Sequence, residues 1–396
     1  MLKKLVLIAL GTLGLIALFT ISPSARADGG APNLAYIAGS AKGISVFDVA
    51  QQKVTSTINV SGDPHAVALS LDARFLYVTQ PAENRFSIIA TRTGQTICTA
   101  NIAGAPSLLV VDINTNLVYV AGNQAATVSA IDGTNCAIKR TLSTEGPVYG
   151  LGLAAVGSSL PNSSGSQIWV SASNALQIFD GNSGKQIRSI AVASPGYISI
   201  PAGTTAYVTS RTGGLDAIDL ATQKVVPLLT TGTYGPMDYD ATTGEVYVPD
   251  LDNKQLIVLT PVNTGVALPH EPNRTISLSE KPAAIAITSD GQLGFVALQG
   301  GDVLMLDLPG RQSIQTFHVG GDPHAIITGL YPPTLGTTPQ QASTVTTLAN
   351  IAGYAFIVLL FVVPFILFRR FSKSQKNNVK VETEKEEEEE ESSTEP

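Results

Sequence analysis

Two copies of one pentapeptide hold the side chains best suited to bind a ligand or a metal ion. The sequence Gly-Asp-Pro-His-Ala occurs in "SGDPHAVALS" and again in "GGDPHAIITG", so Asp63 and His65 recur as Asp322 and His324. Imidazole nitrogens and carboxylate oxygens are common ligands of divalent metals, and a carboxylate beside a coordinating histidine also orients its ring. This chemistry requires the two copies, 259 positions apart, to meet in space.

Other motifs that carry chemistry are absent from the sequence. It contains no Gly-x-Ser-x-Gly, no His-Glu-x-x-His, no phosphate loop and no Cys-x-x-Cys. The catalytic residues therefore stay unknown, and no cofactor is predicted beyond a divalent metal at His65 and His324. The net charge of −7 and the lack of a basic patch in the middle of the chain exclude nucleic acid as the expected partner.

A repeat of about 40 residues must position these side chains. A proline precedes an apolar stretch at Pro64, Pro106, Pro147, Pro195, Pro236, Pro282 and Pro323. Each unit continues with an aromatic-centred strand such as "FLYVTQ", a third strand that often ends in Asp, and an alternating fourth strand. Four short strands per unit at this period are typical of a propeller blade.

The units at the two ends of the repeat are incomplete in complementary ways. The first, from Asn33, lacks its leading strand, and the last, from Pro323, consists of nothing else. We therefore predict an all-β, seven-bladed β-propeller over residues 33–331, closed by pairing "LAYIAGS" with "HAIITGLY" in one blade. Such closure removes exposed sheet edges. Six blades with an unpaired edge strand are the alternative.

The stretch "DPHAVALSLDARFLYVT" resembles the YVTN family of β-propeller repeats. "LYVTQ" and "AYVTS" match its Tyr-Val-Thr strand best, whereas the unit from Pro147 to Val192 matches poorly. The resemblance implies the propeller fold for most of residues 33–331. It implies little about function, because this architecture hosts binding proteins, lactonases and redox enzymes.

The propeller prediction makes the two histidines neighbours. The first strand of a blade lines the channel, and the residue after each proline stands at its mouth: His65, Ser107, Val148, Gly196, Met237, Ala283 and His324. Departures from the repeat that could also serve a site are Glu145, Tyr149, Tyr197, Arg211, Tyr234 and Asp238. The competing interpretation makes Asp-Pro-His an ordinary turn, in which Asp binds backbone amides, Pro fixes φ and His covers the channel rim.

Cys98 and Cys136 are the only cysteines and the one candidate pair for a disulfide. We place them on the fourth strands of consecutive blades. Outer strands of adjacent blades splay apart, whereas a disulfide needs Cα atoms within about 7 Å. The expectation is therefore against a bond, although an oxidising compartment would permit one.

The two ends of the chain carry targeting signals. Residues 1–27 have the positive start, apolar run and Ala-x-Ala ending of a signal peptide. After a linker at residues 332–345, residues 346–368 predict a transmembrane helix, since "LANIAGYAFIVLLFVVPFILF" is uncharged and long enough to span a bilayer. The basic "RRFSKSQKNNVK" places the tail, residues 369–396, in the cytoplasm, and its Glu-rich end predicts disorder.

These features predict a single-pass protein of the cytoplasmic membrane with an extracytoplasmic propeller. Its expected function is a binding or scaffold module that meets a protein or small-molecule ligand at the propeller face, where loops from all blades converge. The alternative is a lactonase-like or metal-dependent propeller enzyme with its site at the channel mouth. A third interpretation is a structural protein of the cell surface.

Overall fold

The computed structural model describes residues 33–156, 165–201, 203–261 and 274–329. The predicted signal peptide, linker, transmembrane segment and tail lie outside these residues. Within the described part of the chain no helix is long and apolar enough to span a bilayer. The structure thus gives the predicted transmembrane helix no support.

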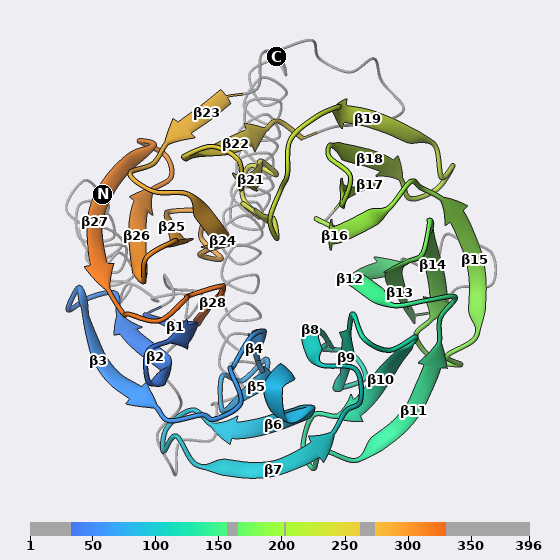
Figure 1. Ribbon diagram of the computed structural model, residues 1–396, viewed down its shortest axis with the longest axis horizontal. Coiled ribbons are helices and arrows are strands. Elements are labelled where there is room, and N and C mark those ends of the chain that lie inside the picture. Colours follow the sequence, from blue (N-terminus) through green and yellow to red (C-terminus); the bar gives the residue numbers. More distant parts are fainter. Residues whose placement is uncertain (1–32, 157–164, 202, 262–273, 330–396) are drawn as a thin grey trace, which may run out of the picture. The chain divides into compact units, whose positions relative to one another are not determined.

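Seven four-stranded antiparallel sheets surround a central opening (Figure 1). The inner strands are β28 (Ala325–Gly329), β4 (Val67–Leu69), β8 (Pro106–Asp112), β12 (Val148–Val156), β16 (Pro195–Ser199), β20 (Asp238–Tyr239) and β24 (Pro282–Ile287). The second strands are β1 (Leu34–Ser40), β5 (Phe75–Gln80), β9 (Leu117–Gly122), β13 (Gly165–Ala172), β17 (Thr205–Ser210), β21 (Val246–Asp250) and β25 (Leu293–Leu298).

The third and fourth strands complete each blade toward the rim. The third strands are β2 (Gly43–Asp48), β6 (Arg85–Ala90), β10 (Thr127–Asp132), β14 (Ala175–Asp180), β18 (Leu215–Asp219), β22 (Gln255–Leu259) and β26 (Asp302–Asp307). The outer strands are β3 (Lys53–Ile58), β7 (Thr96–Asn101), β11 (Ile138–Ser143), β15 (Gln186–Ala191), β19 (Val225–Leu229), β23 (Arg274–Ser277) and β27 (Gln312–His318). One 3₁₀ turn, Pro81–Glu83, joins β5 to β6. The seven-bladed propeller is confirmed.

The ring closes within one blade, as predicted. Strand β28 is the inner strand of the sheet β28-β1-β2-β3. Its register pairs Gly329 with Leu34 and Ala325 with Ala38, and the amide of Asn33 donates to the carbonyl of Gly329 at 2.9 Å. The predicted alternative of six blades with an unpaired strand is therefore wrong, because β28, from the far end of the repeat, is the inner strand that the blade of β1 lacked.

The recurring aromatic residue of each second strand fills the space between blades. These buried side chains are Tyr36, Tyr77, Tyr119, Trp169, Tyr207, Tyr247 and Phe295. Two of them also bridge to the following blade, since the hydroxyl of Tyr77 donates to the carbonyl of Gly133 at 3.1 Å and that of Tyr119 to Gly181 at 3.2 Å. A large ring with a polar tip suits this place, because it buries apolar area while its hydroxyl finds a partner.

Strand direction gives the propeller two different faces. The connections from fourth to first and from second to third strands lie on one face, which we call the histidine face because it carries His65 and His324. The connections from first to second and from third to fourth strands lie on the other. We call this the termini face, because Asn33 and Gly329 meet there.

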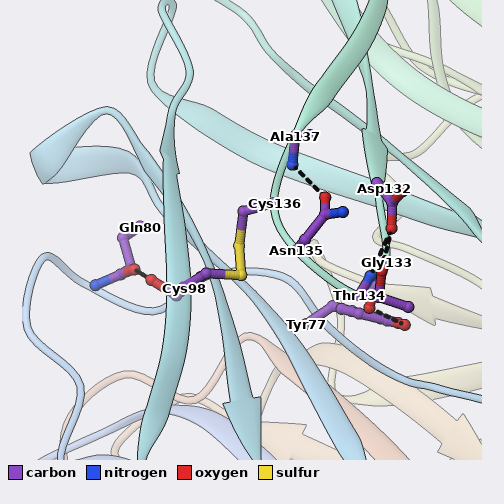
Figure 2. Close-up of a disulfide and its surroundings, with 10 residues drawn as sticks. Tyr77, Gln80, Cys98, Asp132, Gly133, Thr134, Asn135, Cys136 and Ala137 are labelled. Carbon is purple, nitrogen blue, oxygen red and sulfur yellow. Dashed lines mark hydrogen bonds between the residues drawn. A yellow bond between two sulfur atoms is a disulfide. The ribbon is translucent and has the colours of Figure 1, made fainter.

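A disulfide joins Cys98 to Cys136, with their Cα atoms 5.9 Å apart (Figure 2). The expectation against this bond was wrong because only Cys98 lies on an outer strand. Cys136 lies in the turn before β11, where its left-handed backbone (φ 59°) and a hydrogen bond from its amide to the carbonyl of Asp132 fold the chain back. The turn of one blade thereby reaches β7 of the blade before it.

We predict that this disulfide stabilises the ring across one blade boundary. The bond closes a loop with a sequence separation of 38 residues, which in the chain-entropy description corresponds to about 3–4 kcal/mol of unfolding free energy. Urea unfolding should show the loss in the Cys98→Ala/Cys136→Ala variant and a similar loss in wild type treated with reductant. Equal midpoints for oxidised and reduced wild type would contradict the prediction.

Candidate functional site

The threonine of the Tyr-Val-Thr strand fixes the backbone at His65. The amide of His65 donates to the carbonyl of Thr79 at 3.0 Å, and the amide of Ala66 donates to the Thr79 hydroxyl at 2.9 Å. The same contact recurs where the Tyr197 amide donates to the Thr209 hydroxyl at 2.8 Å. The repeat thus holds the start of the inner strand, and the residue there faces the channel mouth.

A glycine makes room for the second copy of the pentapeptide. Gly39 has a φ of 80° beside a bulge in β1, and its carbonyl accepts the amide of Asp322 at 2.8 Å. A Cβ at Gly39 would collide with the carbonyl oxygen of Asp322 and lie 2.9 Å from Nδ1 of His324. Only glycine combines this left-handed backbone with so close an approach.

Closure of the ring brings the two imidazoles into contact. The ring centroids of His65 and His324 are 4.1 Å apart with an interplanar angle of 33°. Nε2 of His324 lies 3.2 Å from the carbonyl oxygen of Pro64. In the tautomer that donates this bond, Nδ1 of His324 keeps its lone pair. The predicted neighbour relation between the two histidines is confirmed.

One carboxylate joins the histidine pair. Asp63, His65 and His324 each offer one ligand atom, and these three atoms lie within 4.8 Å of one another. Asp322 is not part of this group, although its pentapeptide is identical. The two copies differ in backbone, since Asp63 has a left-handed φ of 56° and Asp322 does not. Sequence identity therefore predicted both aspartates, whereas local conformation selects one.

Burial keeps His65 neutral at physiological pH. It lowers the pKa of His65 from 6.5 to about 4, and a positive charge on His324 acts in the same direction. Asp63 and Asp322 oppose this shift through their negative charges. A neutral imidazole has a free lone pair, which is the form that binds a metal ion or accepts a hydrogen bond from a ligand.

The histidines border a cavity in the channel of about 230 Å³. Its walls include Ser107, Leu109, Leu151 and Tyr197 beside His65 and His324. Of the seven post-proline residues predicted at the channel mouth, His65, Ser107, Ala283 and His324 line this cavity, whereas Val148, Gly196 and Met237 do not. The volume suits a small ligand, since sites for drug-sized molecules begin at roughly 300 Å³.

Two departures from the repeat have charges of their own. The guanidinium of Arg211 lies 3.6 Å from the ring centroid of Tyr149, a cation–π contact near the histidine face. Asp238 accepts the amide of Ile287 at 2.7 Å, and burial raises the pKa of its carboxyl to about 6. Neither Arg211 nor Asp238 borders the cavity. Both residues stood out in the sequence because they deviate from the repeat. That deviation did not indicate what either side chain does.

The cluster has the donor set of a divalent transition-metal site but not yet its spacing. Two imidazole nitrogens and one carboxylate oxygen match three-ligand Zn²⁺ sites with an open fourth position. Bonds of about 2.0–2.1 Å would bring the ligand atoms to roughly 3.3 Å from one another, closer than the 4.8 Å limit of this cluster. Binding a metal ion here therefore requires small rotations of the side chains, and Asp63 is exposed and free to make one.

Comparison with known proteins identifies the fold. No family model and no curated protein matches the sequence. The chain resembles Kuenenia stuttgartiensis hydrazine synthase at 14% identity, over 70% of this chain and 92% of that chain, with a TM-score of 0.57. The Cps50 (Swd1) β-propeller domain of Myceliophteria thermophila gives the same identity and coverages with a TM-score of 0.58. For the dihydro-heme d1 dehydrogenase NirN, identity is 12%, each chain is covered to 74%, and the TM-score is 0.53. At such identities the likeness shows a β-propeller and nothing further.

We predict that metal-free protein loses stability as the pH falls from about 6.5 to about 4. In this interval the unfolded chain binds a proton at His65 that the folded chain does not, because the folded pKa is about 4. Above pH 6.5 His65 is neutral in both the folded and the unfolded chain, so its protonation no longer lowers the free energy of unfolding. An imidazole NMR titration in the presence of chelator should find the His65 midpoint near 4. The His65→Gln variant should lose part of the acid sensitivity that His318→Gln, at the exposed rim, retains. A midpoint near 6.5 would contradict the prediction.

Proposed function

We propose that this chain is a membrane-anchored, extracytoplasmic binding module whose ligand binds at the channel mouth on the histidine face. The observation that carries the proposal is the cavity with both neighbouring imidazoles at its border. The polar groups converge from two blades onto an otherwise largely apolar hollow, which is the usual composition of a ligand site. The resemblance of the repeat to the YVTN family stays a prediction and does not distinguish among the functions that this architecture hosts.

A divalent transition-metal ion is the ligand that the cluster favours, alone or as the link to a small anionic molecule. His65 supplies a neutral nitrogen, His324 a second ring and Asp63 the negative charge that a cation requires. Mixed nitrogen and oxygen donors suit Zn²⁺, Ni²⁺ or Cu²⁺ better than Mg²⁺ or Ca²⁺, which prefer oxygen alone. With three protein ligands, one position stays open for a further group.

The extracytoplasmic location has a structural argument in its favour. The Cys98–Cys136 disulfide is of a kind that forms and persists in oxidising compartments. The signal sequence at residues 1–27 agrees with export, and the uncharged residues 346–368 with their basic flank agree with a single anchor. The tail at residues 369–396 would then lie in the cytoplasm.

We expect the purified chain to bind one Zn²⁺ or Ni²⁺ ion at the histidine cluster. Elemental analysis after dialysis and isothermal titration should show at least tenfold weaker binding in His65→Ala/His324→Ala, because two of three ligands are lost. The matched control, His270→Ala/His318→Ala, removes the chain's other two histidines and should bind as wild type does. Absence of uptake by wild type, or equal uptake by both variants, would remove the metal from the proposal.

The anchor predicts that the full chain stays in membranes washed with alkaline carbonate. A chain ending after Val345 should instead be released into the soluble extracytoplasmic fraction, because it lacks the uncharged segment. Protease added to intact cells or spheroplasts should degrade the propeller and spare the tail. Release of the full chain by carbonate would contradict the anchor while leaving the ligand site untouched.

A second candidate function is a lactonase-like, metal-dependent hydrolase, and the proximity of Asp63 to the histidine pair favours it. A metal bound there would polarise a lactone carbonyl and lower the pKa of a bound water. Lactone hydrolysis that depends on added metal and disappears in His65→Ala would establish this candidate. Metal binding without hydrolysis of any lactone would favour the binding module, and absence of both would favour the structural surface protein.

A further inference from the structure

The exposed aliphatic side chains of the described residues gather on one face. Those with large apolar side chains in contact with solvent are Val54, Leu71, Ile97, Ile113, Ile138, Ile187 and Ile314. Leu71 (80% exposed) and Ile113 (57%) lie in turns from first to second strands. The other five lie within the first three residues of outer strands, next to turns from third to fourth strands. All seven therefore lie on the termini face or on the outer rim next to it.

The same face exposes many cations and a single carboxylate among the described residues. The exposed cations are Lys53, Arg74, Arg92, Lys139, Lys185, Arg188, Lys224 and Arg274, and the exposed carboxylate is Asp72. Asp72 is paired with Arg74 at 3.4 Å. Two less exposed carboxylates also pair with these cations, Asp132 with Lys139 at 3.2 Å and Glu245 with Arg274 at 3.5 Å. The face thus combines aliphatic side chains with an excess of exposed positive charge.

Turn chemistry explains why so few carboxylates are exposed there. The aspartates that end the third strands turn inward and accept hydrogen bonds from the turn backbone. Asp48 accepts the amide of Gln51 at 2.8 Å and Asp180 that of Ser183 at 2.7 Å. These carboxylates keep their negative charge but are less exposed than the lysines and arginines that follow them.

The exposed charged groups of the histidine face are mostly of the opposite sign. Its exposed carboxylates are Asp63, Glu83, Glu145, Asp252, Glu280 and Asp322, and its exposed cations are Lys42, Arg211 and Lys254. The large exposed aliphatic residues are absent from this face of the described structure. The propeller is therefore polarised between its two faces, although the sequence as a whole has a net charge of −7.

The first and last residues of the propeller that the structure describes also lie on the termini face. Asn33 and Gly329 lie side by side there. Residues 330–345 connect the propeller to the predicted anchor and reach at most about 60 Å when fully extended. An anchor on so short a connection keeps the propeller close to its own bilayer.

We propose that the termini face lies against the anionic surface of the bilayer that holds the anchor, so that the histidine face points away from the membrane. Aliphatic side chains among lysines and arginines are the composition of surfaces that bind the headgroup region of anionic membranes. Each cation near such a surface contributes about a fivefold gain in affinity. The proposal rests on the anchor for its choice of bilayer, while the polarity of the two faces stands without it.

Site-specific lipid quenching tests this orientation with the full chain reconstituted in vesicles. Both native cysteines are in the disulfide, so Leu71→Cys labels the termini face alone and Asn123→Cys, in an exposed connection of the histidine face, is the matched control. Six-residue strands separate the two labels by about 20 Å. In phosphatidylglycerol–phosphatidylcholine vesicles, a headgroup spin label should quench the Leu71→Cys probe at least threefold more than the Asn123→Cys probe.

Charge variants identify the residues responsible. Lys53→Glu/Lys185→Glu/Lys224→Glu should reduce quenching of the Leu71→Cys probe to the level of the control probe, as should pure phosphatidylcholine vesicles or high salt. The same change on the histidine face, Lys42→Glu/Lys254→Glu/Lys281→Glu, should leave the quenching unchanged. Circular dichroism and thermal unfolding of both variants establish that the fold is intact.

The outcomes separate this proposal from the anchor. Equal quenching of both probes, or stronger quenching at Asn123→Cys, overturns the orientation even if carbonate leaves the chain in the membrane. Release by carbonate with preferential quenching of the Leu71→Cys probe rejects the anchor and supports the lipid-binding face. Lipid-independent self-quenching of the Leu71→Cys probe would assign the face to a second copy of the chain and overturn the proposal.

Discussion

Closure of the ring through the pairing of β28 with β1 is the constraint on which the other features depend. Each blade buries its two faces against its neighbours, so an incomplete ring would expose apolar sheet surface and a strand edge. The register that pairs Leu34 with Gly329 also determines on which face the propeller starts and ends. It brings His324 beside His65 and places both ends of the propeller on the face opposite to them. One set of hydrogen bonds thus builds the site and orients the molecule.

The two faces differ because different kinds of connection form them. Several turns of the termini face use a carboxylate to accept backbone amides, as Asp48 and Asp180 do. The connections of the histidine face are held by backbone contacts such as that between His65 and Thr79, so their exposed side chains can vary. Variation at this face leaves room for the cluster of Asp63, His65 and His324.

The repeat made the fold predictable, whereas features that depend on a single unit could not be predicted. The recurring proline and the aromatic second strand predicted blade number, strand order and closure, because every unit reports the same arrangement independently. The disulfide escaped prediction because it depends on a turn that folds Cys136 back at a positive φ. The different roles of Asp63 and Asp322 escaped it as well, since identical pentapeptides adopt different backbones there. Asp238 stood out in the sequence, yet its raised pKa arises from burial that only the packed ring creates.

The sequence by itself determined the seven blades, the identity of the strands and the neighbour relation of the two histidines, because strand period and repeat length are local properties of the chain. Tertiary structure alone decided which carboxylate joins His65 and His324, that burial lowers the pKa of His65 to about 4, and that Cys98 reaches Cys136. It also decided that exposed cations and aliphatic side chains share one face, since this depends on which carboxylates turn inward. Distances, burial and exposure belong to the assembled ring, and no single repeat contains them.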